Sequence, residues 1–511
     1  MVSKWSERAK TAGRHTGAVA WRVLAVLAAL ELFYLLVANL ILCTPLLKKF
    51  AAQGDDVRVD YGSAYSLIPG RIEVRGLRVR MHDHNVEFEV AVERGTLDVS
   101  LHELFRKRFH ALRVDGEGVG YRMRHKLSHV GLEGPRVAAY PPIAGFPDPP
   151  LFRGPPSPPI PDADYDLWEV KVENITAQVR EIWILEYRYR GPGVARGSFL
   201  LRPARYYEVG PATLDLAGGS LHLGRDAVAE RTKLHLRMVV EGSDVQKLQG
   251  LEPLNKVVAD ARGTFEGTDL RFLDAYLGPH AGAVARGAGT IDFDLRLHHG
   301  SLVPPSTLSA HFGDAELRGS DFEVHSDKLT VSTRSDAEHG KVRGHGELRF
   351  DGTTASFGDR HSGRFNGTLV ADDVAVPMGE RPSSGALRLR VDRAAALLPL
   401  ATPPRILRDL EQTLLDLEGV DAFARVRGGK TPLLDLRDAR SGHLKVTGYY
   451  LGRAEQPEGA FLLRTPAANV GLRITSKGTD WSPLVSDEWL KDEVARKRGR
   501  RAEPDNPFAT D

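Results

Sequence analysis

Alternation of apolar and polar residues runs through most of this 511-residue chain and limits what it can fold into. The clearest segments are RIEVRGLRVRM (71–81), NVEFEVAVE (85–93), GTLDVSL (95–101), KLHLRMVVE (233–241), TIDFDLRLHH (290–299), ALRLRV (386–391) and NVGLRIT (469–475). A period of two residues is typical of strands with one buried face, whereas parallel βαβ sheets carry continuous apolar runs. Turn residues separate the segments. We therefore expect a mainly β body of antiparallel strands, and we disfavour a doubly wound enzyme fold.

The apolar face of such a sheet has to be covered by a second sheet, by helices or by a ligand. Helical patterns are few and lie at 244–258, 268–277 and 404–417, the last with leucines at helical spacing. Self-closure into a sandwich and bound lipid therefore remain as alternatives. The candidate lipid-facing residues are Val74, Val79, Phe88, Val90, Leu236, Met238, Phe293, Leu295 and Leu389.

A hydrophobic run near the N-terminus, residues 18–42, predicts a membrane-spanning helix. Its length of about 37 Å at ~1.5 Å per residue exceeds a hydrocarbon core of ~30 Å. The run is longer than the core of a typical signal peptide and lacks a small-residue cleavage site, which favours an uncleaved signal anchor over a cleaved signal. A lipoprotein signal ending at Cys43 is disfavoured because the bulky Leu42 precedes that cysteine.

Basic residues concentrate before the run, which places the N-terminus in the cytoplasm and the body on the other side of the membrane. They are Lys4, Arg8, Lys10 and Arg14, against Lys48 and Lys49 after it. Glu31 lies within the apolar run, where a carboxylate gains from a polar partner. It is the candidate contact to another membrane helix, and the alternative is that the surrounding leucines simply outweigh it.

Changes in composition divide the chain into segments. We expect a cytoplasmic N-terminus (1–17), a transmembrane helix (18–42), an N-terminal β unit (43–133), a Pro-rich insertion or linker (134–163), a central β-rich region (164–392), a helical element (393–418), a C-terminal β region (419–480), and a short helix with a disordered basic tail (481–511).

Signals for catalysis or cofactor binding are weak throughout the sequence. The net charge of +2 gives no reason to expect a nucleic acid, and the single cysteine, Cys43, excludes an intramolecular disulfide. GEGVGY (116–121) lacks the spacing of a dinucleotide loop, and His82 and His84 have no identifiable third metal ligand. We therefore assign no catalytic, cofactor-binding or metal residues, and we expect a protein that is not an enzyme.

The order of these features resembles the AsmA-like family of bacterial envelope proteins, the TamB-related group. The resemblance is carried by residues 60–126: the GLRVR strand at 76–80, the VSLHEL element at 99–104, a basic turn at 106–108 and the returning strand LRVDGEGVGYRMR at 112–124. A helical element, PPRILRDLEQTLLDLEG, at 403–419 and the strands at 317–335 and 367–377 are similar to later parts of that family. The Pro-rich insertion is a departure from the family pattern.

The resemblance implies an elongated, curled β-sheet whose apolar face forms a groove. It also implies a role in phospholipid transport or outer-membrane biogenesis, from a single-pass anchor in the inner membrane with the bulk of the chain in the periplasm. The expected partners are membrane lipids, an inner-membrane helix, and an outer-membrane or envelope protein. The alternative is a structural or assembly factor of the envelope with a closed β core.

Overall fold

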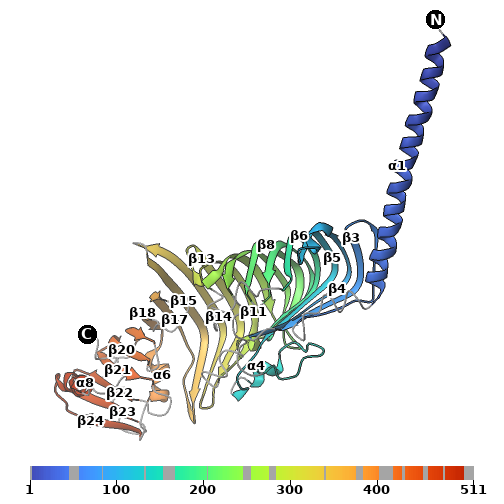
Figure 1. Ribbon diagram of the computed structural model, residues 1–511. Coiled ribbons are helices and arrows are strands. Elements are labelled where there is room, and N and C mark those ends of the chain that lie inside the picture. Colours follow the sequence, from blue (N-terminus) through green and yellow to red (C-terminus); the bar gives the residue numbers. More distant parts are fainter. Residues whose placement is uncertain are drawn as a thin grey trace. The chain divides into compact units, whose positions relative to one another are not determined.

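The computed structural model describes residues 3–44, 57–82, 85–131, 134–152, 167–203, 205–244, 255–274, 283–338, 341–375, 384–401, 418–428, 432–452, 458–475 and 478–499. These residues fall into two compact units (Figure 1). Unit 1 contains 1–215 and 239–248, and unit 2 contains 216–238 and 249–511. The division falls within β8 (Tyr206–Leu223) and β9 (Asp226–Asp244).

Unit 1 begins with one long helix, α1, and continues as a curled sheet (Figure 1). Its elements are α1 (Ser3–Cys43), β1 (Val57–Asp60), β2 (Ser63–Ile68), β3 (Arg71–His82), β4 (Val86–Val99), α3 (Leu101–Leu104), β5 (Arg108–His125), α4 (Gly134–Ala138), β6 (Glu169–Ile184) and β7 (Tyr187–Arg202). Within α1, residues Val23–Cys43 are long and apolar enough to cross a membrane, with a mean hydropathy of 2.3. By length and composition this segment fits a membrane anchor or a signal sequence.

Among the described residues of β1 to β7, the pairings are antiparallel except for the parallel pair β5–β6. Parallel neighbours cannot be joined by a tight hairpin and need a longer crossover connection. The Pro-rich segment lies between these two strands in the sequence and makes that crossover. Its described part, 134–152, starts with the short helix α4 and packs against the sheet through contacts given below.

Unit 2 is a run of antiparallel strands with short helices between or after them. The elements are β10 (Val257–Gly267), η4 (Leu270–Leu273), β11 (Val284–His298), β12 (Ser301–Leu302), β13 (Ser306–Arg318), β14 (Phe322–Glu338), β15 (Lys341–Phe357), β16 (Arg360–His361), β17 (Phe365–Ala375), β18 (Ser384–Val391), α6 (Ala394–Ala401), β19 (Val420–Arg427), β20 (Leu433–Ser441), β21 (Leu444–Leu451), β22 (Glu458–Arg464), β23 (Asn469–Thr475), β24 (Gly478–Pro483) and α8 (Trp489–Gly499).

The predicted fold class is confirmed: the chain is mainly β, with curled antiparallel sheet, a few short helices and one apolar N-terminal helix. Each alternating segment named above lies wholly or mostly in a strand, and GTLDVSL ends at Leu101, the first residue of α3. One turn prediction is wrong, because β4 continues without a break through Arg94 and Gly95, which pair with Glu117 and Gly116 of β5. A glycine does not end a strand when both neighbouring strands continue to offer hydrogen bonds.

The helix predictions have mixed outcomes. The predicted helix 268–277 is represented by the single 3₁₀ turn η4. The described ends of 244–258 are strand, since Asp244 ends β9 and Val257 starts β10. Residues 245–254, 275–277 and 404–417 lie outside the described residues. The expected short helix near the C-terminus is α8.

Candidate functional site: an apolar sheet face

The apolar side chains of unit 1 meet in two rows that cross β3, β4, β5 and β6. Because directly paired residues point to the same face of a sheet, the printed register identifies these rows. One row is Val79, Val90, Tyr121 and Ile182, and the other is Met81, Phe88, Met123 and Ile184. We call these eight residues the unit 1 face. All of them are half-buried except Ile184, which is 37% exposed.

The opposite face of the same strands is polar, and the Pro-rich segment covers it. Three arginines of the sheet donate to backbone carbonyls of that segment: Arg80 to Ala144 (2.7 Å), Arg122 to Pro142 (3.3 Å), and Arg124 to both Pro141 (3.2 Å) and Pro147 (2.9 Å). The indole of Trp183, on β6, donates to the carbonyl of Ala139. The described part of the segment, 134–152, therefore lies on the charged side of this sheet, opposite the unit 1 face.

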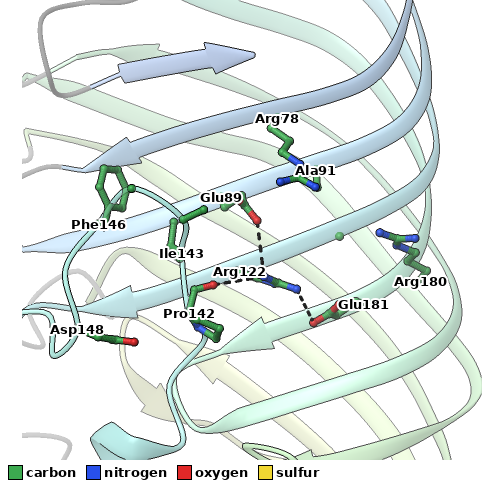
Figure 2. Close-up of a pocket in the computed structure, with 13 residues that line it drawn as sticks. Arg78, Glu89, Ala91, Arg122, Pro142, Ile143, Phe146, Asp148, Arg180 and Glu181 are labelled. Carbon is green, nitrogen blue, oxygen red and sulfur yellow. Dashed lines mark hydrogen bonds and ion pairs between the residues drawn. The ribbon is translucent and has the colours of Figure 1, made fainter. Parts of the chain in front are cut away.

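Where the Pro-rich segment meets the sheet there is a pocket of about 420 Å³ (Figure 2). Arg122 lies at its centre, 3.8 Å from a carboxylate oxygen of Glu89 and 3.6 Å from one of Glu181. Ile143 and Phe146 of the segment line the other side. Two carboxylates therefore balance the positive charge of the Arg122 guanidinium. This arrangement fits a contact that holds the segment on the sheet better than a binding site for charged substrates.

Unit 2 carries a longer apolar row on one face of its strands. Read across the ladder from β10 to β23, the paired residues are Phe265, Ile291, Ala310, Val331, Leu348, Leu369, Leu389, Ala422, Ala439, Val446, Leu463 and Val470. We call this the unit 2 row. Ile291 and Ala310 are buried, while every other member is half-buried. The alternating apolar residues of neighbouring strands therefore line up side by side and form an apolar stripe that runs perpendicular to the strands.

Phenylalanines beside the unit 2 row lie over glycines of the neighbouring strand. A Cβ added to Gly263 would lie 2.6 Å from Phe293, and one added to Gly367 would lie 2.6 Å from Phe350. Gly289 with Phe312 and Gly448 with Phe461 repeat the arrangement. The ring shields backbone that the glycine leaves bare. The aromatic rings thus lie along the sheet and extend its apolar surface.

Among the described residues, a helix packs on this face of unit 2 at the β10 end. At the β10 end, η4 packs on it: Leu270 is buried with Ile291, and Phe272 meets Phe265 edge to face at 5.9 Å. At the other end, α8 packs on the opposite face, where Trp489 contacts a buried cluster of Leu433, Tyr449, Leu451 and Ala460. Val331 still packs against the buried cluster at the β10 end, and the row is half-buried from Leu348 onward.

The sequence-predicted residues occupy different environments. Val79, Phe88 and Val90 come together on the unit 1 face, while Val74 packs in a buried cluster with Leu42, Tyr61 and Ala64 at the end of α1. In unit 2, Leu389 belongs to the row, Phe293 packs beside its buried end, and Leu295 pairs with Ala261. Leu236 and Met238 lie half-buried on β9. Glu31 is half-buried on α1.

Several residues of the two faces were not singled out from the sequence. Tyr121 and Ile182 of unit 1, and Leu348 and Leu369 of unit 2, occupy central places in the rows. The sequence shows that each of them alternates with polar residues along its own strand, but it does not show which residues pair with them on the neighbouring strands. Burial raises the pKa of the Tyr121 phenol to about 12.

Candidate metal ligands do not cluster in the described part of the chain. No group of three His, Cys, Asp or Glu residues there could hold a metal ion. The ring of His82 packs edge to face on Phe146 at 5.1 Å, and His84 lies outside the described residues. Comparison with protein-family models, with curated proteins and with solved structures gives no match.

Proposed function

We propose that this protein is a membrane-anchored, non-enzymatic lipid-handling protein whose apolar sheet faces shelter acyl chains. The observation that carries the proposal is which side of the sheet is covered. In unit 1 the described part of the Pro-rich segment covers the charged face and not the unit 1 face. A protein that only needed a closed core would place that segment over the apolar side chains instead.

Energetics support an acyl chain as the occupant. Exposing a sixteen-carbon chain to water costs on the order of 12 kcal/mol, at ~0.8 kcal/mol per CH₂, so moving a lipid through water requires a continuous apolar surface. The unit 2 row is such an apolar surface, because it passes from strand to strand and contains no charged residue. Phospholipids of the anchoring membrane are the proposed ligands.

The proposed setting follows the resemblance to AsmA-like envelope proteins. In it, α1 crosses the inner membrane once with the N-terminus in the cytoplasm, and the β body works in the periplasm in phospholipid transport or outer-membrane biogenesis. The partners would be membrane lipids, a helix of the inner membrane in contact with Glu31, and an envelope or outer-membrane protein. The charge asymmetry around residues 18–42 and the alternating strands support this setting.

Photo-crosslinking tests the proposal. A benzophenone amino acid replaces Leu348 or Leu369 in the row, or Phe88 on the unit 1 face, and Arg349 serves as the matched control on the other face of β15. We expect crosslinks to phospholipid at the three apolar positions and none at Arg349, together with phospholipid in the purified protein. Equal labelling at Leu348 and Arg349, with no co-purified phospholipid, would reject the proposal.

A further inference from the structure

The last turns of α1 are fixed to the first hairpin of the sheet by side-chain hydrogen bonds. Asn39 donates from Nδ2 to the carbonyl of Ser66 and accepts from the Ser66 amide, both over 2.8 Å. The hydroxyls of Tyr34 and Ser66 are 2.7 Å apart, and the amide of Gly70 donates to Tyr34 Oη over 3.1 Å. The β2–β3 turn is therefore held at the level of Tyr34 and Asn39 along the helix.

This level lies inside the apolar part of α1. The segment Val23–Cys43 has 21 residues, about 31 Å at ~1.5 Å per residue, which matches a hydrocarbon core of ~30 Å. Asn39 and Tyr34 precede Cys43 by four and nine residues, so they lie about 6 and 13 Å from that end. A span of about 20 residues ending before Tyr34 would have to begin near Arg14 and would place two arginines in the membrane.

Apolar side chains are exposed at the same end of the sheet. Leu67 and Ile68, the last residues of β2 before the turn that contacts Tyr34, are 66% and 55% exposed. Gly70 follows them, and a Cβ on it would lie 3.9 Å from Cγ of Leu101, which places α3 beside this turn. Phe105, directly after α3, is 93% exposed. Soluble surfaces rarely present several large apolar residues together without a partner.

Three basic residues directly follow Phe105 in the sequence. Arg106, Lys107 and Arg108 follow Phe105 and are all exposed. Glu103 lies 3.4 Å from Arg106 and 3.6 Å from Arg108, so one carboxylate faces two guanidinium groups. Exposed aromatic and aliphatic residues next to a basic cluster are typical of surfaces that enter the interface of an anionic membrane.

We propose that this end of unit 1, formed by Leu67, Ile68, Phe105 and the basic cluster 106–108, is inserted into the leaflet of the membrane that α1 crosses. Anionic phospholipid headgroups would pair with the basic cluster while the three apolar side chains enter the acyl region. The inference rests on the proposed anchoring by α1 and deepens it. Lipid would then leave the bilayer at the sheet itself, without first crossing water.

Fluorescence from single cysteines tests this insertion. The full chain with Cys43→Ser carries an environment-sensitive label at Leu67→Cys or Phe105→Cys. It is reconstituted in vesicles of phosphatidylcholine and phosphatidylglycerol containing spin-labelled lipid quenchers. Leu30→Cys, exposed on α1, reports on the anchor, and Leu151→Cys, an exposed apolar position in the Pro-rich segment, is the matched control. We expect blue-shifted, lipid-quenched emission at Leu30, Leu67 and Phe105, and aqueous emission at Leu151.

The outcomes separate the two proposals. Lipid quenching at Leu30 with aqueous emission at both Leu67 and Phe105 would leave the anchor intact and overturn the insertion of the sheet. Aqueous emission at Leu30 as well would overturn the anchoring and the insertion together. If insertion is correct, replacing all three basic residues 106–108 with glutamine weakens quenching at Phe105 in phosphatidylglycerol vesicles and leaves it unchanged in phosphatidylcholine alone.

Discussion

Arg124 donates from Nε to Oε2 of Glu87 over 2.8 Å, and the two side chains are 0% and 5% exposed. The same guanidinium donates to Asp148 Oδ1 (2.6 Å) and to two carbonyls of the Pro-rich segment. One buried cation therefore joins β4, β5 and the crossover between β5 and β6. The Pro-rich segment is held on this face of unit 1 by this group together with apolar packing of Val137, Tyr140 and Ile143.

Replacing Arg124 with alanine is expected to destabilise unit 1 by roughly 3 to 5 kcal/mol, because Glu87 would be left buried without its partner. Equilibrium denaturation followed by tryptophan fluorescence measures the loss, since Trp183 lies against the same segment. Arg113→Ala is the matched control: its pair with Asp115 is solvent-exposed and should cost about 1 kcal/mol or less. Similar losses for the two variants would contradict the role given to Arg124.

Gly367→Ala should be destabilising although it adds only a methyl group. The new Cβ would lie 2.4 Å from the carbonyl oxygen of Arg390 and 2.6 Å from the ring of Phe350, and such overpacking costs about 1 to 3 kcal/mol. Gly313→Ala is the control in the same unit, because the nearest atom to its Cβ would be 4.0 Å away. Thermal unfolding distinguishes them, and an unchanged midpoint for Gly367→Ala would refute the close approach.

Alternation in the sequence was enough to predict the strands and to identify Phe88, Val90 and Leu389 as members of apolar faces. It was not enough to predict which residues become neighbours, since register depends on pairing between distant segments. The row from Val331 through Leu348 to Leu369 exists only once three strands are aligned. Strand periodicity is local information, whereas a row across the sheet is not.

The position of the Pro-rich segment could not be predicted for a related reason. Its composition excludes a central strand but does not say which face of the sheet it crosses. The covered face is the one that carries Arg80, Arg122 and Arg124, because these arginines donate hydrogen bonds to backbone carbonyls of the segment. The segment is rich in proline and therefore has few backbone amides of its own to bond those carbonyls. In the sequence these arginines look like ordinary solvent-facing members of alternating strands.

The raised pKa of Tyr121 predicts a loss of stability in alkali. The unfolded chain ionises near the ordinary value of 10.0, whereas burial raises the pKa of the folded group to about 12. The contribution is therefore fully present below pH 10 and is lost as the pH rises toward 12, because the folded state holds the proton more tightly. Tyr121→Phe should flatten this part of the stability curve of unit 1. Absorbance of tyrosinate, titrated for both proteins, would contradict the assignment if the difference fell near pH 10.

Asn39→Leu should separate the attachment of the hairpin from the insertion of α1. Leucine keeps the helix apolar but removes the two hydrogen bonds to Ser66, one of which satisfies that residue's amide. Losing a partner of a sheltered amide costs roughly 1 to 3 kcal/mol, which corresponds to about 5- to 150-fold faster opening. Hydrogen exchange measured on the β2–β3 hairpin should rise accordingly, while exchange in β5 stays the same.

Thr44→Ala, which removes an exposed hydrogen bond to Ile41, is the control and should change exchange in neither element. Unchanged exchange at Ser66 in Asn39→Leu would show that Asn39 does not hold the hairpin against the helix.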